Sequence, residues 1–222
     1  MQIFKTTIAA TNTNVESEAY GGKDIKVERA IKATEHALDI ERAFIWGEKK
    51  VTTGANGQPK RATGGVLEFL EAGNSYIQNQ GGVLTEADFD IFLREGFTYG
   101  DSPKKYFMCG GLVLGAISGF AKGRLQTKKE DKSYGLVINE YITPFGTINI
   151  VHNPLLVEDY AGFGMLLDMN SFKYRYLNNR DTKLELNVQA NDADGVIDQY
   201  LTECGLERVQ AANNALLKGV TM

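Results

Sequence analysis

Hydrophobic and small residues recur at helical spacing most clearly between residues 24 and 48. Charged residues fill most of the positions between them, and this period of about 3.6 residues predicts an amphipathic helix. At roughly 1.5 Å per residue the helix would be about 35 Å long, which is long for a small domain. The predicted buried stripe consists of Val27, Ala30, Ile31, Thr34, Ala37, Leu38, Phe44 and Ile45.

The same pattern predicts which positions of this helix tolerate change. Lys26 and Arg29 are predicted to face solvent, so changing either is expected to leave folding almost unaffected. A polar residue at Leu38 is expected to cost several kcal/mol, as other core disruptions do. Asp24 is the predicted N-cap, and Gly47 is predicted to end the helix.

Shorter patterns alternate between helix and strand signals. The predicted helices span residues 66–72, 85–95 and 112–121, and the predicted strands span 106–109, 136–142, 147–152, 165–168 and 184–189. Thr85 and Asp88 have the spacing of a capping box. Residues 50–65 contain glycine, threonine and proline and are predicted to form a loop, while residues 195–209 fit either a helix or a strand. The interleaving indicates a mixed α and β protein.

Residues 2–15 are rich in threonine and β-branched residues and are predicted to be extended. The segment contains no turn that would give it a strand partner of its own. An unpaired strand is typically completed by another chain. Together with a helix longer than its domain, this favours a protein whose role is assembly.

Charge argues against one large class of function. The 222 residues are 43% hydrophobic and 23% charged, and the net charge is −4. An acidic chain lacks the electrostatic footprint of a protein held on DNA by its own phosphate contacts. The short basic pairs Lys60/Arg61 and Lys128/Lys129 are predicted to be solvated loops.

Cysteine usage and apolar runs indicate where the chain is made. Cys109 and Cys204 form no metal-ligand or disulfide pattern and are predicted to be small buried residues. The longest apolar run is too short to span a bilayer, and no signal peptide is visible. We therefore expect synthesis in a reducing, intracellular compartment.

A glycine turn after a short apolar run raises the possibility of a phosphate site. Gly110 and Gly115 have the four-residue gap of a phosphate-binding loop. That motif next requires Lys and Ser/Thr, but Ala116 and Ile117 occupy those positions. The dinucleotide pattern also fails, because Leu112 replaces its second glycine. Packing of a helix on a strand is the favoured interpretation.

Nucleophile and metal patterns are equally incomplete. Ser118 has Ala116 and Phe120 where a nucleophile elbow requires glycines. His36 and His152 are the only histidines, too few for a zinc site, and each is predicted to be solvated or satisfied by neighbours.

The acidic candidates resemble turn residues. Asp168 follows an apolar run, and Asp159, Glu158 and Glu140 could be its partners. Nothing in the spacing directs two of them to one site, so turn or cap roles are favoured. Residues 191–194, "NDAD", lack the length and bidentate glutamate of an EF-hand loop and are predicted to form a turn.

Aromatic and basic residues alternate between positions 172 and 176. Phe172, Tyr174 and Tyr176 interleave with Lys173 and Arg175, a pattern that can stack on single-stranded nucleic acid. A strand with one aromatic and one charged face has the same pattern and is favoured.

Two function classes besides assembly stay open. A small-molecule enzyme with an unrecognised site would require a pocket that gathers Asp168, Glu140 and His152. A nucleic-acid-binding module would use Lys173 and Arg175. The prediction is nevertheless of a non-enzymatic protein with no catalytic, cofactor or metal residue.

Seven segments occur in an order that resembles the major capsid proteins of tailed phages. The resemblance covers nearly the whole chain, and it depends on the order and spacing of the segments more than on any one of them. They are "QIF", "DIERAFIWG", "RATGGVLEFL", "TEADFDIFL", "ITPFGTINIVHN", "LLDMNSFKYRYL" and "YLTECGLERVQAANNALLKGV".

The resemblance implies an α+β fold of the Hong Kong 97 type. Such a fold has a long spine helix, a peripheral domain, and an axial domain of helices around a small sheet. It implies that residues 1–22 are the returning arm of an extended loop, that 23–59 and 186–222 form the peripheral domain, and that 60–185 form the axial domain. It also favours strand over helix for residues 195–209.

The resemblance further implies self-assembly. Hexamers and pentamers of the chain would form an icosahedral shell that encloses phage DNA without sequence-specific binding, alongside scaffold, portal or decoration proteins and without a membrane. The protein would be made in the host bacterial cytoplasm and would reside in the virion. Family members carry a further segment before "QIF", so this chain is expected to be a truncated or processed form or an unusual member.

Overall fold

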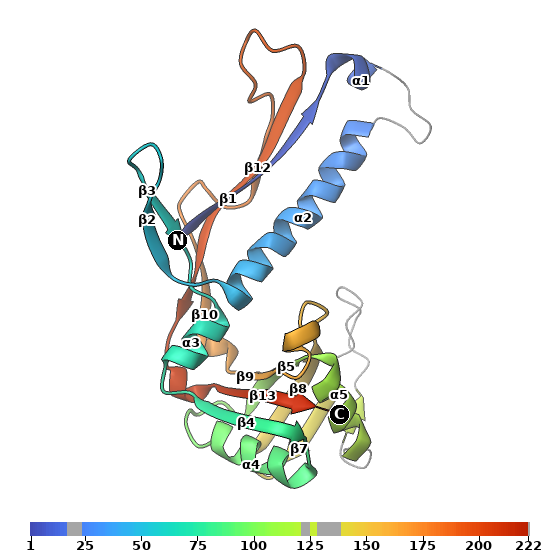
Figure 1. Ribbon diagram of the computed structural model, residues 1–222, viewed down its shortest axis with the longest axis vertical. Coiled ribbons are helices and arrows are strands. Elements are labelled where there is room, and N and C mark those ends of the chain that lie inside the picture. The colour runs from blue at the N-terminus through green and yellow to red at the C-terminus, as the bar shows by residue number, and fades with distance from the viewer. Residues whose placement is uncertain (17–23, 121–124, 128–138, 222) are drawn as a thin grey trace. The chain divides into compact units, whose positions relative to one another are not determined.

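The computed structural model describes residues 1–16, 24–120, 125–127 and 139–221 (Figure 1). The described chain divides into two units. Residues 1–68 and 174–207 form the first unit, and residues 69–173 and 208–222 form the second. The basic pair Lys128/Lys129 lies outside the described residues.

The first unit is built on a sheet whose central strand is β12, Val196–Arg208, and the other strands pair with it. The strand order is β1-β12-β10, where β10 is Phe172–Tyr176, and β11 (Lys183–Glu185) is also paired to β12. β1, Gln2–Ala10, runs antiparallel to β12 from Gln2↔Cys204 to Ala10↔Val196. A short helix, α1 (Asn12–Glu16), follows β1.

The pairing of β1 corrects one expectation and decides another. Residues 2–10 do have a partner in their own chain, and it comes from the far end of the sequence, so no local turn could reveal it. Residues 195–209 form a strand, as the resemblance implied. The predicted strand at 184–189 is limited to β11.

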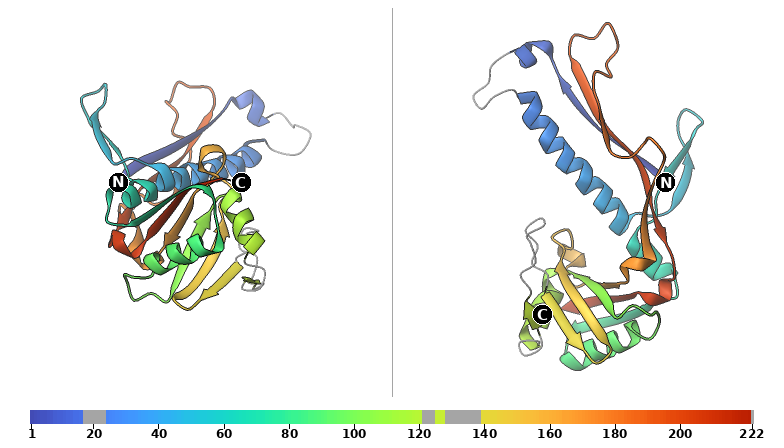
Figure 2. Two further views of the ribbon diagram at one scale, coloured as in Figure 1. Left: turned by 60° about the horizontal axis from the view of Figure 1, so that its bottom comes forward. Right: turned by 180° about the vertical axis from the view of Figure 1, so that it is seen from behind.

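The long helix is confirmed as α2, Asp24–Trp46, and it contacts β1 (Figures 1 and 2). Gly47 follows directly and donates its amide to the Ala43 carbonyl at 3.0 Å, so its predicted role as the end of the helix is confirmed.

The buried face of α2 differs from the predicted one. His36 and Ile45 are buried, at 2% and 5% exposure, whereas Val27 and Ile31 are each 53% exposed. The strands beneath the helix present Thr6, Thr202 and Asp198 among apolar residues such as Phe4 and Ile8. His36 and Arg29 turn inward because they bond these three polar groups. The amphipathic pattern was therefore identified correctly and assigned to the wrong side over the first half of the helix.

Arg29 and Leu38 show the consequence of this reversal. The Arg29 guanidinium is 28% exposed and pairs at 2.5 Å with the Asp198 carboxylate, which is completely buried. Its predicted solvent-facing role is wrong, while Lys26 is exposed as predicted. Leu38 is only half-buried.

The predicted loop at 50–65 contains a β-hairpin. β2 (Lys50–Thr53) and β3 (Pro59–Ala62) pair antiparallel, and Gly57 adopts φ +74° in the connecting turn. Nearly every residue of the two strands is exposed. With neither face buried, the hairpin has no alternating hydrophobic pattern for sequence reasoning to detect.

The second unit contains a seven-stranded mixed sheet in the order β4-β13-β9-β5-β8-β7-β6. The strands are β4 (Tyr76–Val83), β5 (Lys104–Cys109), β6 (Leu125–Thr127), β7 (Asn139–Thr143), β8 (Gly146–His152), β9 (Gly164–Leu167) and β13 (Ala215–Thr221). The helices and 3-10 turns are α3 (Val66–Ala72, which spans the boundary between units), α4 (Glu86–Gly96), α5 (Gly111–Phe120), η1 (Glu158–Tyr160), η2 (Met169–Ser171) and η3 (Ala211–Asn213).

Most local predictions for this unit are confirmed. All three short helices form, and Thr85 and Asp88 make the reciprocal bonds of a capping box. The hairpin of β7 and β8 also forms, although residues 136–138 of the predicted strand lie outside the described residues. Three strands were missed. β4 and β13 each carry glycine near one end, including Gly219 at φ +76° beside a shift in register, and β6 is only three residues long.

Aromatic rings hold α4 against this sheet. Phe89 contacts Phe107 and Tyr141 edge-on, with ring centroids 5.5 and 5.7 Å apart. Phe92 also contacts Phe107, and all four residues have 0% exposure. The core of the second unit is thus built around these aromatic side chains.

Candidate functional site

The glycine turn before α5 is occupied by main chain. A Cβ at Gly110 would lie 2.4 Å from the Ala161 carbonyl oxygen. The amides of Gly110 and Leu112 donate to the carbonyls of Phe163 and Ala161 at 3.0 and 3.2 Å. Amides that a phosphate would need are already paired, so the interpretation of this turn as a packing contact is confirmed.

Ser118 lies on the exposed face of α5. Cys109 and Cys204 are free thiols with 0% exposure, as predicted. Burial raises the pKa of Cys109 to about 12 and also raises the pKa of Cys204. Both thiols are therefore held in the protonated, unreactive form.

His36 joins α2 to two strands. Its Nδ1 lies 2.9 Å from the Thr6 hydroxyl of β1, and its Nε2 lies 2.8 Å from the Thr202 hydroxyl of β12. Tyr200 packs against the imidazole with ring centroids 5.9 Å apart. Burial lowers the pKa of His36, against an opposing effect of the Asp39 carboxylate. The prediction of a histidine satisfied by its neighbours is confirmed.

The three side chains that an enzyme would need to gather are separated by the sheet register. His152 pairs with Cys109 across β8 and β5. Asp168 directly follows Leu167, the last residue of β9, which pairs with Tyr106 of β5. Asp168 is therefore level with position 105 of β5, about 13 Å along the strand from the level of His152. Glu140 lies on β7, three strands from β9, or about 14 Å across.

Each carboxylate has a structural role or a surface position. Asp168 accepts bonds from the Asn170 amide at 3.0 Å and the Ser102 hydroxyl at 2.9 Å, which confirms its predicted cap role. Glu140 pairs with Lys104 at 3.4 Å. Glu158 and Asp159 are exposed in η1. Within the described ranges, no group of three or more His, Cys, Asp and Glu side chains is placed to hold a metal ion.

The alternating segment at 172–176 is strand β10. Arg175 on its charged side forms an ion pair with Glu207. On the other side the rings of Tyr174 and Tyr176 lie tilted against each other with centroids 5.8 Å apart, and the Tyr174 hydroxyl donates to Asp181 at 2.8 Å. Burial and this bond raise the pKa of Tyr174. The prediction of a strand with one aromatic and one charged face is confirmed.

A buried lysine in the second unit was not anticipated from the sequence. The Lys105 ammonium has 0% exposure and donates to the carbonyls of Gly96 and Asn213 at 2.7 Å and of Tyr99 at 3.2 Å. Burial lowers its pKa. The ammonium donates hydrogen bonds to carbonyls at the C-terminal end of α4, where the helix dipole favours a positive charge, so its role is structural. In the sequence, only its position directly before the predicted strand at 106–109 indicated burial.

The strongest candidate for a functional surface is the outward face of α2. This apolar stripe consists of Val27, Ala30, Ile31, Thr34 and Ala37, all of them exposed. A regular, uncharged face on a helix of 23 residues is typical of an interaction surface. The sequence pattern identified these residues but predicted that they face the interior of their own chain.

Among the described residues, none of the helices combines the length and apolar character that a bilayer crossing requires.

Residues 1–221 match the family described as the SU10 major capsid protein. The chain is also 25% identical over 197 residues to a major capsid protein of Pseudomonas phage PaMx41, an alignment covering 83% of this chain and 47% of the relative. The chain therefore spans about half the length of the curated relative that it matches.

Several solved structures have a similar fold. The capsid of cyanophage A-1(L) superposes with a TM-score of 0.64 at 11% identity, over 100% of this chain and 78% of that one. The capsid of a native GTA particle superposes with a TM-score of 0.64 at 14% identity, over 99% of this chain and 73% of that one. The holo-SrpI encapsulin complex from Synechococcus elongatus PCC 7942 superposes with a TM-score of 0.64 at 11% identity, over 99% of this chain and 74% of that one.

At these identities the likeness establishes the fold alone. The predicted mixed α and β fold of the Hong Kong 97 type is confirmed.

Proposed function

This chain belongs to the SU10 major capsid protein family. We propose that copies of it assemble side by side into the shell of a tailed-phage head. The observation that carries the proposal is the family match along residues 1–221. The exposed apolar stripe of α2 supports it, because this stripe is a surface that burial between copies would stabilise.

The physical basis of the proposed function is repeated, symmetric burial. A shell requires no strong single contact, since each subunit makes several contacts that the symmetry repeats. We propose that the chain has no catalytic activity, in keeping with a structural family and with the separation of Asp168, Glu140 and His152. Its net charge of −4 is compatible with enclosing DNA without binding it specifically.

For the layout of the subunit, we propose that the first unit is the peripheral domain, with α2 as its spine, and that the second unit is the axial domain. The proposed boundaries are 23–59 and 186–222 for the former and 60–185 for the latter, with residues 1–22 as an arm that overlaps a neighbour. The two units of the structure differ from these boundaries at three places. Residues 60–68 and 174–185 lie in the first unit, and residues 208–222, which include β13, lie in the second.

The partners follow from this role. Hexamers and pentamers of the chain would build the shell, with scaffold, portal or decoration proteins joining them. The protein would be made in the cytoplasm of a host bacterium and would then reside in the virion.

Substituting the apolar stripe tests the proposal. Val27→Gln combined with Ile31→Gln removes apolar surface from α2 without changing charge, and Lys26→Gln on the same helix is the control. We expect electron microscopy of the wild-type chain and of the control to show capsomers, tubes or shells. The free energy of unfolding of the double variant should lie within about 0.5 kcal/mol of the wild-type value, as for other exposed substitutions. The double variant should nevertheless assemble poorly.

Two outcomes would contradict the proposal. A wild-type chain that stays monomeric at every concentration and turns over a substrate would remove the capsid role. A double variant that assembles as well as the control would remove the apolar stripe from the interface.

A further inference from the structure

A groove in the first unit lies between the start of β1 and the β2–β3 hairpin. It encloses about 810 Å³ and is lined by Ile3 of β1 on one side and by Lys50, Lys60 and Arg61 on the other. Ile3 is 51% exposed. The groove therefore combines an apolar wall with a cationic wall.

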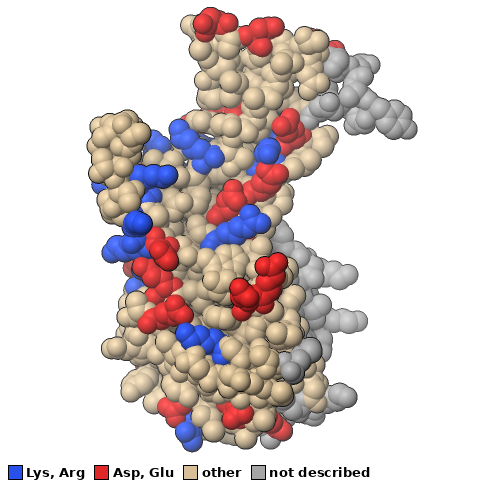
Figure 3. Space-filling view, in the orientation of Figure 1, with Lys and Arg blue, Asp and Glu red and all other residues tan. Residues whose placement is uncertain are grey.

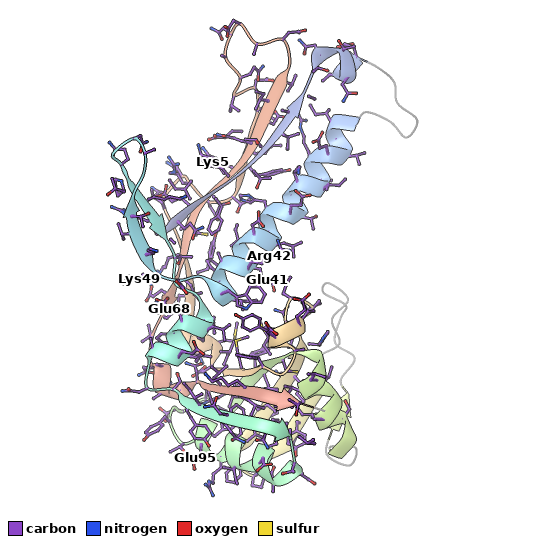
Figure 4. All side chains as sticks on the ribbon, in the orientation of Figure 1. Lys5, Glu41, Arg42, Lys49, Glu68 and Glu95 are labelled. Atoms are coloured by element: carbon purple, nitrogen blue, oxygen red, sulfur yellow. The ribbon has the colours of Figure 1, made fainter. Side chains whose placement is uncertain are left out.

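The positive charge of this groove is not neutralised from within. Its one acidic lining residue, Glu203, is paired with Arg180 at 2.7 Å. Among the ion pairs between described residues, none engages Lys50, Lys60 or Arg61. Figure 4 shows Lys49 just before β2 and Lys5 further along β1, and both are exposed.

The opposite end of the first unit has the complementary chemistry. The tip loop, residues 186–195 between β11 and β12, carries exposed Asp192 and Asp194. No Lys or Arg occurs in residues 6–16 or 184–198. Figure 3 shows acidic side chains at the end where this loop lies and basic side chains over the hairpin.

The tip loop also offers apolar surface and a defined shape. Leu186 and Val188 are 53% and 42% exposed, which matches the apolar wall of the groove. The loop is anchored, because the Asn12 side chain donates to Asp194 at 2.5 Å and the Val188 amide donates to the Ile197 carbonyl at 2.8 Å. A loop held in this way loses little conformational entropy on binding.

The loop cannot fill the groove of its own chain. In the β1–β12 ladder the groove end is marked by Gln2↔Cys204 and the loop end by Ala10↔Val196. Eight residues of strand separate them by about 27 Å. A contact between the two surfaces must therefore join different copies.

We propose that the basic groove receives the acidic tip loop of a second copy of this chain. Because the two surfaces differ, the contact is heterologous and extends from copy to copy until symmetry closes it. This inference rests on the proposed self-assembly and names one of its contacts. A nucleic acid backbone would satisfy the cations but would leave the exposed apolar side chain of Ile3 uncovered.

Zero-length cross-linking of full-length chains tests the contact at residue level. Equal amounts of unlabelled and ¹⁵N-labelled protein are mixed and treated with a carbodiimide, which joins a carboxylate to an amine only when they touch. We expect mixed-isotope peptides that link Asp192 or Asp194 to Lys50 or Lys60. Asp192→Asn with Asp194→Asn should abolish them, whereas Asp101→Asn with Asp159→Asn, a matched pair of exposed carboxylates, should not.

Charge reversal provides an independent readout. Asp192→Lys with Asp194→Lys, or Lys60→Glu with Arg61→Glu, should each reduce the sedimenting assembled fraction at least tenfold. Combining all four reversals in one chain restores opposite charges across the contact and should recover most of the assembly.

The outcomes separate this inference from the proposed function. Shells that form without the predicted cross-links, or reversals that do not rescue each other, would overturn the tip-to-groove contact and leave the capsid role intact. No shells and no mixed-isotope peptides of any kind would overturn both. Salt-sensitive binding of a DNA oligonucleotide that depends on Lys60 and Arg61, without cross-links to the tip loop, would assign the groove to nucleic acid instead.

Discussion

The imidazole of His36 is the central polar contact between α2 and the sheet of the first unit. Both of its nitrogens are bonded to threonine hydroxyls, and Thr202 is in turn 2.8 Å from the Thr182 hydroxyl. In a neutral imidazole one nitrogen donates and the other accepts, and the two hydroxyls can satisfy either arrangement. Protonation would place an uncompensated charge in a buried site, and this is why burial lowers the pKa.

This site predicts a pH dependence of stability. The unfolded chain takes up a proton on His36 as the pH falls below about 6.5, while the folded chain resists it, so the free energy of unfolding should decrease as the pH falls from 7 to 5. The slope from one such group is at most about 1.4 kcal/mol per pH unit. Urea unfolding at several pH values should show this slope in the wild type and in His152→Asn, and its absence from His36→Gln would confirm the source.

Arg29 supports a second residue-scale prediction. Its Nε and Nη2 both bond the buried Asp198 carboxylate, which also accepts from the Asn187 amide at 3.0 Å. Arg29→Met leaves that carboxylate without its cation and should cost about 2 kcal/mol of unfolding free energy. Lys26→Met, on the exposed side of the same helix, should cost less than about 0.5 kcal/mol. Equal melting temperatures of the two variants would reject this account.

At the scale of elements, the turn into α5 illustrates how glycine positions a helix. Gly110 allows the main chain at 161–163 to approach the helix start and to accept its amides. The same approach leaves no room for a side chain at this position. The next residue, Gly111, is exposed, and a Cβ there would meet nothing closer than His152 Nε2 at 4.0 Å.

The two glycines form a matched pair for a stability test. Gly110→Ala should cost about 1–3 kcal/mol, the range for overpacking a tight contact. Gly111→Ala should be neutral or stabilising by up to about 1 kcal/mol, because alanine favours the helical conformation. Thermal melts of both variants check the prediction, and a stable Gly110→Ala protein would contradict the packing role.

At the scale of the whole molecule, two kinds of surface are available for association, and salt should distinguish them. Complementary charges at the groove and the tip loop are screened as the Debye length falls from about 10 Å at 0.1 M salt to about 3 Å at 1 M. Burial of the apolar stripe on α2 does not depend on charge. The two contributions to assembly should therefore separate in a salt series.

The expected result is a partial loss of assembly in high salt. Light scattering of the wild-type chain should fall between 0.1 and 1 M NaCl. A chain carrying Lys60→Gln, Arg61→Gln, Asp192→Asn and Asp194→Asn should assemble less at low salt and show little further change. Identical salt profiles for the two chains would mean that these charges do not contribute.

The sequence predicted which residues form the apolar stripe of α2, but it did not predict that the stripe faces outward. The apolar stripe of α2 was identified from its spacing, because helical periodicity is a local property. Its direction was predicted wrongly, because a periodic pattern does not say whether the partner of an apolar face is the same chain or another copy. The hairpin and the groove beside it gave no signal, since their strands are exposed on both faces.

The sequence by itself determined the features that neighbouring residues decide among themselves: the long helix, the capping box of α4 and the glycine turn before α5. Tertiary structure alone decided that β1 pairs with β12 and that α2 turns His36 and Arg29 inward. The reason is that Thr6, Thr202 and Asp198 come from strands far from α2 in the chain, and only folding brings these polar partners to the helix and fixes which of its faces is buried.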